Sequence, residues 1–276
     1  MNPVMERIDT GWYERLQPAW DQVREALAEY GHIFLFTDFD GTLSETTAIP
    51  SAAVIEERTK AILRNLCCQK SITVAVLSGR ALFDVAERVG LPLIYGGDHG
   101  LEIRGPAFEH VAPGAEAARM RLPAICNSIR SAARGIPGAL VESKRYSASV
   151  HFRHVPVYQV PELAGIVRGC VDDPCFEVRM GHCVMEVRPR VNWDKGIAAE
   201  WLLRKHAARP EQAICLGDDE TDEDMFRRLA GAVTVRVAAA GVPSSAAYRV
   251  ERRDVDDVLQ GLLDTIHGLA VITGEY

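Results

Sequence analysis

The stretch "FTDFDGTLS", residues 36–44, ends an apolar, β-prone run with two aspartates that stand two positions apart. The run before it, "HIFLF" over 32–36, predicts a buried strand. On extended backbone, side chains at i and i+2 point to the same side, so Asp38 and Asp40 are expected to face one way. Gly41 then permits a sharp turn that brings backbone N–H groups toward an anion.

Helical and strand patterns alternate after this stretch. The expected elements are a helix over 50–68, a strand over 71–78, a helix over 81–90 that ends at Gly90, and a strand over 91–97. After Pro189 we expect helices over 194–207, 222–230 and 254–270, strands over 212–218 and 232–237, and an edge strand over 246–250. This alternation predicts an α/β fold built on a doubly wound parallel sheet.

A different pattern interrupts the alternation near Phe108. It comprises a helical stretch over 113–134, two alternating strands within 138–155, a helix over 161–170 and a hairpin over 175–189 that turns at Gly181. Such a unit has apolar faces of its own and predicts an inserted α+β domain. The expected division is a helical leader over 1–30 with an interruption at Pro18, a core over 31–107 and 190–276, and a cap over 108–189. Hinges are expected near Gly105–Pro106 and Pro189–Asn192.

The composition argues against several classes of protein. The 276 residues carry a formal net charge of −7, which argues against nucleic-acid binding, and no run of about 18 apolar residues predicts a membrane span. The first residues do not resemble a signal peptide, and seven cysteines without a disulfide framework predict a reducing, cytoplasmic setting. The set Cys170, Cys175, His182 and Cys183 matches no common zinc spacing, so idle or buried thiols are expected there.

Three polar clusters stand where strands of the sheet are expected to end. They are Asp38–Thr42, Ser78–Arg80 and Gly217–Asp224, and Lys195 opens a helix near the last of them. Ligands of an open parallel sheet bind beyond the carboxyl ends of its strands, so these groups are expected to share one crevice. Three crowded carboxylates need a cation, and an all-oxygen set suits Mg²⁺ beside a phosphate. One carboxylate of the first pair is expected to attack phosphorus, and the other to act as acid and base.

The phrases "DFDGTLS", "VLSGR", "NWDKG" and "GDDETDEDMF" occur in the order of the four signatures of the haloacid dehalogenase-like phosphohydrolases, which this sequence resembles. The resemblance implies that Asp38 is the nucleophile, Asp40 the acid and base, and Ser78 and Lys195 the catalytic phosphate contacts. It implies Mg²⁺ held by Asp38, Asp40 (through its backbone carbonyl), Asp218 and Asp219. For Asp222 and Asp224, a place near the metal and a helix N-cap remain open alternatives.

Further phrases narrow the resemblance to the trehalose-6-phosphate phosphatases. They are "GDHG" over 97–100, which has aspartate where that family more usually has asparagine, "VESK" over 141–144, "HFR" over 151–153 and "MEVRP" over 185–189. The resemblance covers roughly residues 32–240. It implies that the residues contacting substrate are Gly41, Thr42, Gly79, Arg80, His99, Gly100, Glu142, Lys144, Arg153, Glu186 and Arg188.

Charged pairs at i and i+2 on three cap strands fit a sugar phosphate. Each pair points to one face, where carboxylates accept hydrogen bonds from sugar hydroxyls and cations donate them. The pairs are Glu142 with Lys144, His151 with Arg153, and Glu186 with Arg188. The alternative is an ordinary solvent-facing sheet with cross-strand ion pairs. Arg80 is expected either to clamp the phosphate or to hold its loop, and His99 either to touch substrate or to pack at the lid hinge.

The implied function is Mg²⁺-dependent hydrolysis of trehalose 6-phosphate through an aspartyl phosphate. The alternatives are a phosphatase for another sugar phosphate, namely sucrose phosphate or glucosyl- or mannosyl-3-phosphoglycerate, and a catalytically silent sugar-phosphate sensor. The expected partners are the sugar phosphate and a trehalose-6-phosphate synthase of the same pathway, with no nucleic acid and no membrane.

Overall fold

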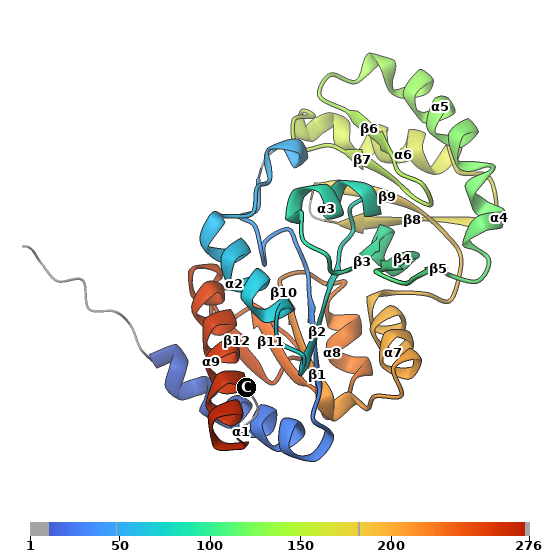
Figure 1. Ribbon diagram of the computed structural model, residues 1–276. Coiled ribbons are helices and arrows are strands. Elements are labelled where there is room, and N and C mark those ends of the chain that lie inside the picture. The colour runs from blue at the N-terminus through green and yellow to red at the C-terminus, as the bar shows by residue number, and fades with distance from the viewer. Residues whose placement is uncertain (1–10, 48, 182, 274–276) are drawn as a thin grey trace, which may run out of the picture.

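An eight-stranded sheet forms the centre of the larger unit in the computed structural model, which describes residues 11–47, 49–181 and 183–273 (Figure 1). Its strand order is β12-β11-β10-β1-β2-β3-β4-β5, parallel from β12 to β3 and antiparallel at β4 and β5. The strands are β1 (Ile33–Thr37), β2 (Ile72–Leu77), β3 (Ile94–Gly97), β4 (Glu102–Gly105), β5 (Phe108–Val111), β10 (Ala213–Gly217), β11 (Val233–Val237) and β12 (Tyr248–Val250). The doubly wound parallel sheet that the sequence predicts is confirmed.

The strand order reverses between β1 and β10, which lie next to each other although most of the chain separates them. Leu35 pairs with Ile214, and both strands are buried along their whole length, as strands covered on two faces should be. The backbone N–H of Asp38 continues this pairing by donating to the carbonyl of Leu216 at 3.0 Å. The crevice at such a reversal is where ligands bind in open α/β sheets.

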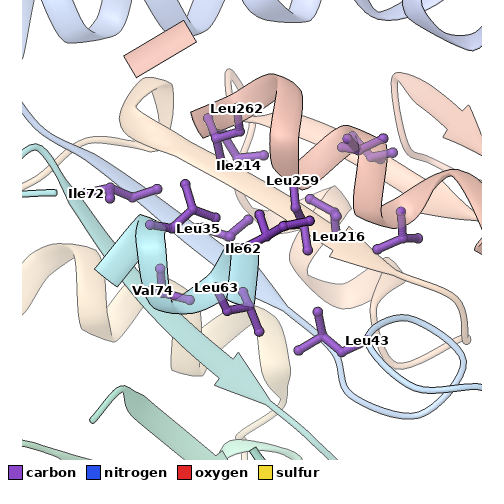
Figure 2. Close-up of a cluster of buried hydrophobic side chains, with 14 of the residues drawn as sticks. Leu35, Leu43, Ile62, Leu63, Ile72, Val74, Ile214, Leu216, Leu259 and Leu262 are labelled. Carbon is purple, nitrogen blue, oxygen red and sulfur yellow. The ribbon is translucent and has the colours of Figure 1, made fainter. Parts of the chain in front are cut away.

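Helices cover both faces of the sheet. On one face lie α1 (Gly11–Tyr30), α2 (Glu57–Cys67), α3 (Leu82–Val89) and α9 (Val255–Thr273), and on the other lie α7 (Lys195–Lys205) and α8 (Glu223–Arg228). Figure 2 shows the first of these layers, where Ile62 of α2 and Leu259 of α9 meet Leu35 of β1. Across the described residues, no helix combines the length and the apolarity that crossing a bilayer requires.

A smaller antiparallel sheet, with strand order β6-β7-β9-β8, stands above the carboxyl ends of the large sheet (Figure 1). Its strands are β6 (Leu140–Ser143), β7 (Ala148–His151), β8 (Phe176–Gly181) and β9 (Val184–Pro189), and its helices are α4 (Ala115–Arg119), α5 (Leu122–Ala132) and α6 (Val160–Cys170). Residues of α5 and α6 share a separate apolar core with β7 and β9. The α+β unit that the sequence predicts therefore forms.

The chain leaves and re-enters the large unit at one place. Val111 and Ala112 on the outgoing side pack in one apolar cluster with Val191 and Trp193 on the returning side. The strand β5 (Phe108–Val111) pairs with β4 in the large sheet, so the small sheet begins later than residue 108. The predicted domain limits and hinges stay predictions.

Three expected elements differ in detail. The helix expected over 50–68 begins only at Glu57, because the extended residue Ile55 bridges to Ser44. The helical stretch expected over 113–134 is two helices, with Pro123 in the first turn of the second, where its missing N–H is tolerated. Pro18 does not interrupt α1, whose residues on either side of it, such as Leu16 and Trp20, are anchored in the core.

Candidate active site

Three carboxylates and one ammonium meet beyond the ends of β1 and β10. Asp38 follows β1, Asp218 follows β10, Asp222 directly precedes α8, and ligand atoms of these three acids lie within 4.8 Å of one another. Lys195, the first residue of α7, donates to Asp38 Oδ1 at 2.7 Å and to Asp222 Oδ1 at 2.8 Å. Only 1% of Lys195 is exposed. Segments far apart in the sequence thus build one buried cluster, as the sequence predicts for Asp38, Asp218 and Lys195.

The charges of this cluster do not balance. Burial, together with the neighbouring carboxylates, raises the pKa of Asp38 to about 8 and that of Asp218 to about 7. Burial favours the neutral amine of Lys195, but Asp222 and Asp38 outweigh it and hold the pKa of the ammonium well above its ordinary value. Three carboxylates facing one ammonium leave an excess of negative charge, and a hard divalent cation with oxygen ligands such as Mg²⁺ fits this donor set.

Gly41 brings the loop that follows β1 very close to Asp218. Its φ is +79°, in the left-handed region, and a Cβ added there would lie 2.2 Å from Asp218 Oδ2. The next residue, Thr42, is buried, and its hydroxyl donates to Asp218 Oδ1 at 3.4 Å. Glycine at position 41 is therefore required on two grounds, the backbone conformation and the space for a carboxylate.

Two predicted metal ligands, Asp40 and Asp219, have side chains outside the acidic cluster. Arg80 holds both oxygens of Asp40, donating from Nε to Oδ2 at 2.7 Å and from Nη2 to Oδ1 at 2.6 Å. Asp219 Oδ1 accepts from the backbone and hydroxyl of Thr221, at 2.8 and 2.7 Å. The carboxylate that completes the cluster is that of Asp222, while Asp224 pairs with Arg227 on α8.

Arg80 and Ser78 serve the loop after β2 in this arrangement. Besides Asp40, Arg80 donates to Asp84 at 2.8 Å and to the carbonyl of Pro50 at 2.8 Å. Ser78 is 1% exposed and its hydroxyl accepts from the backbone N–H of Arg80 at 3.2 Å. These contacts favour the second of the two roles expected for Arg80, that of holding its loop.

A cavity of about 1190 Å³ separates the acidic cluster from the small sheet. Most of the predicted site residues line it, namely Asp38, Asp40, Gly79, Arg80, His99, Glu142, Lys144, Arg153, Glu186, Arg188, Lys195, Asp218 and Asp219. Gly41, Thr42, Ser78 and Gly100 lie outside that lining. The structure thus gathers the core and cap residues that the sequence singles out around one space.

The cap presents a row of polar side chains to this cavity. Glu142, Ser149, Glu186 and Arg179 stand in register across β6, β7, β9 and β8. The sequence interpretation missed Ser149 and Arg179. Ser149 could have been found, because it stands two positions before His151 and therefore shares a face of the strand with it. Within the row, Glu142 Oε2 lies 2.8 Å from His151 Nε2.

Several cap side chains also reach the core. Lys144 Nζ donates to the carbonyl of Gly79 at 2.7 Å, and His99 Nε2 lies 2.9 Å from Glu186 Oε1. Burial lowers the pKa of His99 to about 4, so its imidazole is neutral at physiological pH. The ring touches both Glu186 and Arg188, which places His99 between core and cap.

The cysteines contribute no site among the described residues. All seven are free thiols, and the one group of three or more metal-ligating side chains found in the described ranges is Asp38, Asp218 and Asp222. His182, the fourth member of the set considered for zinc, lies outside the described residues.

Comparison with known sequences gives one family. The family model for trehalose-phosphatase matches residues 36–254. A trehalose-phosphate phosphatase of Mycobacterium marinum is 41% identical over 197 residues, which are 70% of this chain and 50% of that protein. One from Mycobacterium tuberculosis strain H37Rv is 40% identical over 197 residues, again 70% and 50% of the two chains. The chain therefore spans about half the length of the curated relatives it matches.

Comparison with solved structures gives the same architecture. The C-terminal domain of a trehalose-6-phosphate phosphatase from C. albicans superposes with a TM-score of 0.75 at 22% identity, covering 89% of this chain and 97% of that one. A trehalose-6-phosphate phosphatase from Aspergillus fumigatus gives a TM-score of 0.61 at 27% identity, with 89% and 97% covered. The predicted fold class, an α/β core with an inserted cap, is thereby confirmed.

Proposed function

The chain belongs to the trehalose-phosphatase family, and from this premise we propose that it hydrolyses trehalose 6-phosphate to trehalose and phosphate. The observation that carries the proposal is the position of Asp38. Its carboxylate, held by Lys195 at 2.7 Å, lies beneath a cavity whose opposite wall is the polar face of the cap. A nucleophile on one side and hydroxyl-binding groups on the other suit a phosphorylated sugar.

In the proposed reaction Asp38 attacks phosphorus. A bond forms between a carboxylate oxygen of Asp38 and phosphorus while the bond from phosphorus to the sugar oxygen breaks, and Asp40 gives that oxygen a proton. Asp40 then takes a proton from water, which attacks the aspartyl phosphate, so that phosphate leaves and Asp38 is restored. Because Arg80 holds both oxygens of Asp40, the carboxyl group must turn away from Arg80 to reach the leaving oxygen.

Asp38, Asp218 and the backbone carbonyl of Asp40 would hold Mg²⁺, with Asp222 behind them. When bound, the ion neutralises the carboxylates and the charge on the phosphoryl oxygens. Lys195 stays fixed between Asp38 and Asp222, where its positive charge faces the incoming phosphate.

The cap supplies the contacts to the sugar in this proposal. Glu142 and Glu186 accept hydrogen bonds from hydroxyl groups, and Lys144 donates to them. Closure of the cap over the core excludes bulk water and strengthens the electrostatic interactions inside. The proposed setting is the cytoplasm, where free thiols are stable, with a trehalose-6-phosphate synthase supplying the substrate.

The test measures phosphate released from a panel of phosphorylated sugars, each with and without Mg²⁺. We expect turnover of trehalose 6-phosphate with Mg²⁺ and none in the Asp38→Asn variant. Faster release from sucrose phosphate or from glucosyl- or mannosyl-3-phosphoglycerate would reassign the substrate. Binding of a sugar phosphate without turnover in the unaltered chain would make it a sensor instead.

A further inference from the structure

Asp98 is a carboxylate buried in the core whose partners belong to the cap. It opens the short turn Asp98–Gly100 after β3, has a φ of +50°, and is 0% exposed. One oxygen accepts from the backbone N–H of Tyr146 at 3.2 Å, and the other lies in hydrogen-bond contact with the hydroxyl of Ser147. Both partners stand in the loop between β6 and β7 of the cap.

This loop also carries Lys144 into the cavity. The backbone N–H of Lys144 donates to the carbonyl of Ser147 at 2.9 Å, and its ammonium donates to the carbonyl of Gly79 at 2.7 Å. The backbone N–H of Asp98 in turn donates to the carbonyl of Arg80 at 2.7 Å. Asp98 therefore connects the loop that presents Lys144 with the core loop that holds Asp40.

We propose that Asp98 is a positioning residue that fixes the cap loop over residues 144–147 on the core, and that protonating its carboxylate strengthens this hold. The effect on catalysis rests on the proposed function, whereas the hold on the loop does not. Burying a carboxylate costs free energy unless hydrogen bonds compensate for the lost water. For Asp98 these hydrogen bonds come from Tyr146 and Ser147, and they form only while the cap loop lies on the core.

The protonated form can still make hydrogen bonds to both partners, although these bonds alone favour the charged form. A carboxylic acid donates its O–H to the hydroxyl oxygen of Ser147 while its other oxygen still accepts from the N–H of Tyr146. Asparagine has the same shape and offers the same donor and acceptor. The Asp98→Asn variant therefore imitates the protonated state at every pH.

The surrounding charges give the direction of the pH effect. Burial raises the pKa of Asp98 to about 6, against the opposing influence of Lys144 and of the two hydrogen bonds, and Glu102 adds to the rise. Glu102 on β4 is itself paired with Arg145, whose guanidinium lies over the ring of Tyr146, and Glu116 of α4 accepts from the hydroxyl of that ring. His99 beside it has a pKa lowered to about 4, and that of Glu186 is held well below its ordinary value.

In the open state the exposed carboxyl regains its ordinary pKa, so the closed state binds the proton more tightly. The contribution of Asp98 to closure is then complete below about pH 4, falls as the pH rises to about 6, and is constant above that. A rise from 3.8 to about 6 corresponds to a change of up to about 100-fold in the ratio of closed to open molecules.

Hydrogen exchange at the amide of Tyr146 measures the hold directly, in the full chain and without substrate. We expect protection in the unaltered protein to fall by up to about 100-fold relative to Asp98→Asn between about pH 4 and pH 7. Comparing the two proteins at each pH removes the intrinsic effect of pH on exchange. Asp98→Ala should lose protection of the Tyr146 amide at every pH. If Asp98→Ala does not fold, Ser147→Ala is the second variant, and it should show weaker protection of the same amide.

Glu102→Gln is the matched control. Glu102 also contacts the cap loop, because its carboxylate pairs with Arg145 of that loop. The Arg145 side chain is 54% exposed, and ion pairs of exposed side chains contribute little to stability. We expect a change in protection of less than about fivefold. Equal protection in the unaltered protein, Asp98→Asn and Asp98→Ala at all pH values would overturn the proposal. Parallel pH profiles for the unaltered protein and Asp98→Asn would overturn its protonation step.

Kinetics separate positioning from general structural damage. Asp98→Ala should raise KM for trehalose 6-phosphate by about tenfold, the effect of losing one hydrogen bond from a charged donor, with a smaller loss in kcat, because Lys144 is displaced while Asp38 is not. Asp98→Asn should keep KM at or below that of the unaltered protein at pH 7.5. An equal loss of kcat in both variants would contradict the positioning role. If the unaltered chain turns over no sugar phosphate, the proposed function fails, and the exchange experiment still decides the role of Asp98.

Discussion

Lys195 Nζ lies 2.7 Å from Asp38 Oδ1, although 157 positions separate the two residues in the chain. The pairing exists because β1 ends and α7 begins at the same edge of the sheet, beside the reversal of strand order. The same ammonium reaches Asp222 at 2.8 Å, so it joins a strand end to the loop before α8. Lys195 is thus both a charge in the site and a connection between its parts.

Replacing Lys195 by methionine should destabilise the protein and abolish its activity. The change leaves two buried carboxylates without their cation, and breaking a buried pair costs about 3–5 kcal/mol. Chemical denaturation without Mg²⁺ measures the change in the free energy of unfolding. Lys205→Met is the control, because Lys205 lies at the exposed end of the same helix, and the loss of its cation–π contacts with Phe108 and Trp201 should cost less than about 1 kcal/mol. Equal costs for the two variants would show that the buried pairs are not stabilising.

Replacing Asp38 by asparagine should abolish turnover while the substrate still binds. The amide cannot form the acyl phosphate, and loss of a nucleophile lowers kcat by about 10⁴-fold or more. Phosphate release and calorimetric titration with trehalose 6-phosphate measure the two properties separately. Asp21→Asn provides the comparison, because Asp21 pairs with Arg24 at the surface of α1 and does not line the cavity, and we expect a change in kcat of less than about threefold, since surface substitutions usually change free energies by no more than about 0.5 kcal/mol. Turnover that survives in Asp38→Asn would transfer the nucleophilic role to another residue.

The stabilisation that Mg²⁺ confers should grow with pH. The pKa values of Asp38 and Asp218 are raised to about 8 and about 7, so the metal-free folded state binds protons more tightly than the unfolded state. Stability is then lost as the pH rises through this range, and a divalent cation restores it by replacing the protons. Thermal unfolding with Mg²⁺ or with EDTA, from pH 5.5 to pH 8.5, should show a widening gap in Tm. A gap that stays constant or narrows would contradict the predicted metal site.

Replacing Gly41 by alanine should weaken Mg²⁺ binding by at least about tenfold, the usual cost of disturbing the groups that orient a metal ligand. The new methyl group would lie 2.2 Å from Asp218 Oδ2 and push this carboxylate aside. Gly31→Ala separates this clash from backbone strain, because Gly31 also has a positive φ, +71°, but has nothing within 4 Å of the added Cβ. Both variants should lose about 1 kcal/mol or more of stability, and only Gly41→Ala should lose metal affinity. If calorimetric titration gives the same Mg²⁺ affinity for Gly41→Ala and Gly31→Ala, position 41 acts through backbone strain alone.

Much of the fold followed from local patterns. Short stretches of sequence predict the continuous apolar strands β1, β2 and β10, the end of α3 at Gly90 and the cap hairpin near Gly181. The strands β4 and β5 were missed, because each has only four residues and the pair is joined by a tight turn at Pro106–Ala107 that interrupts the strand pattern. The start of α2 was placed too early, since the pairing of Ile55 with Ser44 is a tertiary contact.

The site was predictable in its residue types and less so in its pairings. The positions of Asp38, Asp218 and Lys195 at strand or helix ends sufficed to bring them together. The choice of Asp222 over Asp219 depends on how the loop after β10 turns, and the capture of Asp40 by Arg80 depends on the packing of another loop. Spacing along the chain does not encode such choices between neighbouring carboxylates.

The packing of Val111 and Ala112 against Val191 and Trp193 closes the long excursion of the chain at its base. Among the described residues, the segment between these two crossings contributes no strand to the large sheet and no carboxylate to the acidic cluster. We therefore expect that a different cap grafted at this junction would leave the acidic cluster assembled and would change which phosphorylated compound the chain accepts.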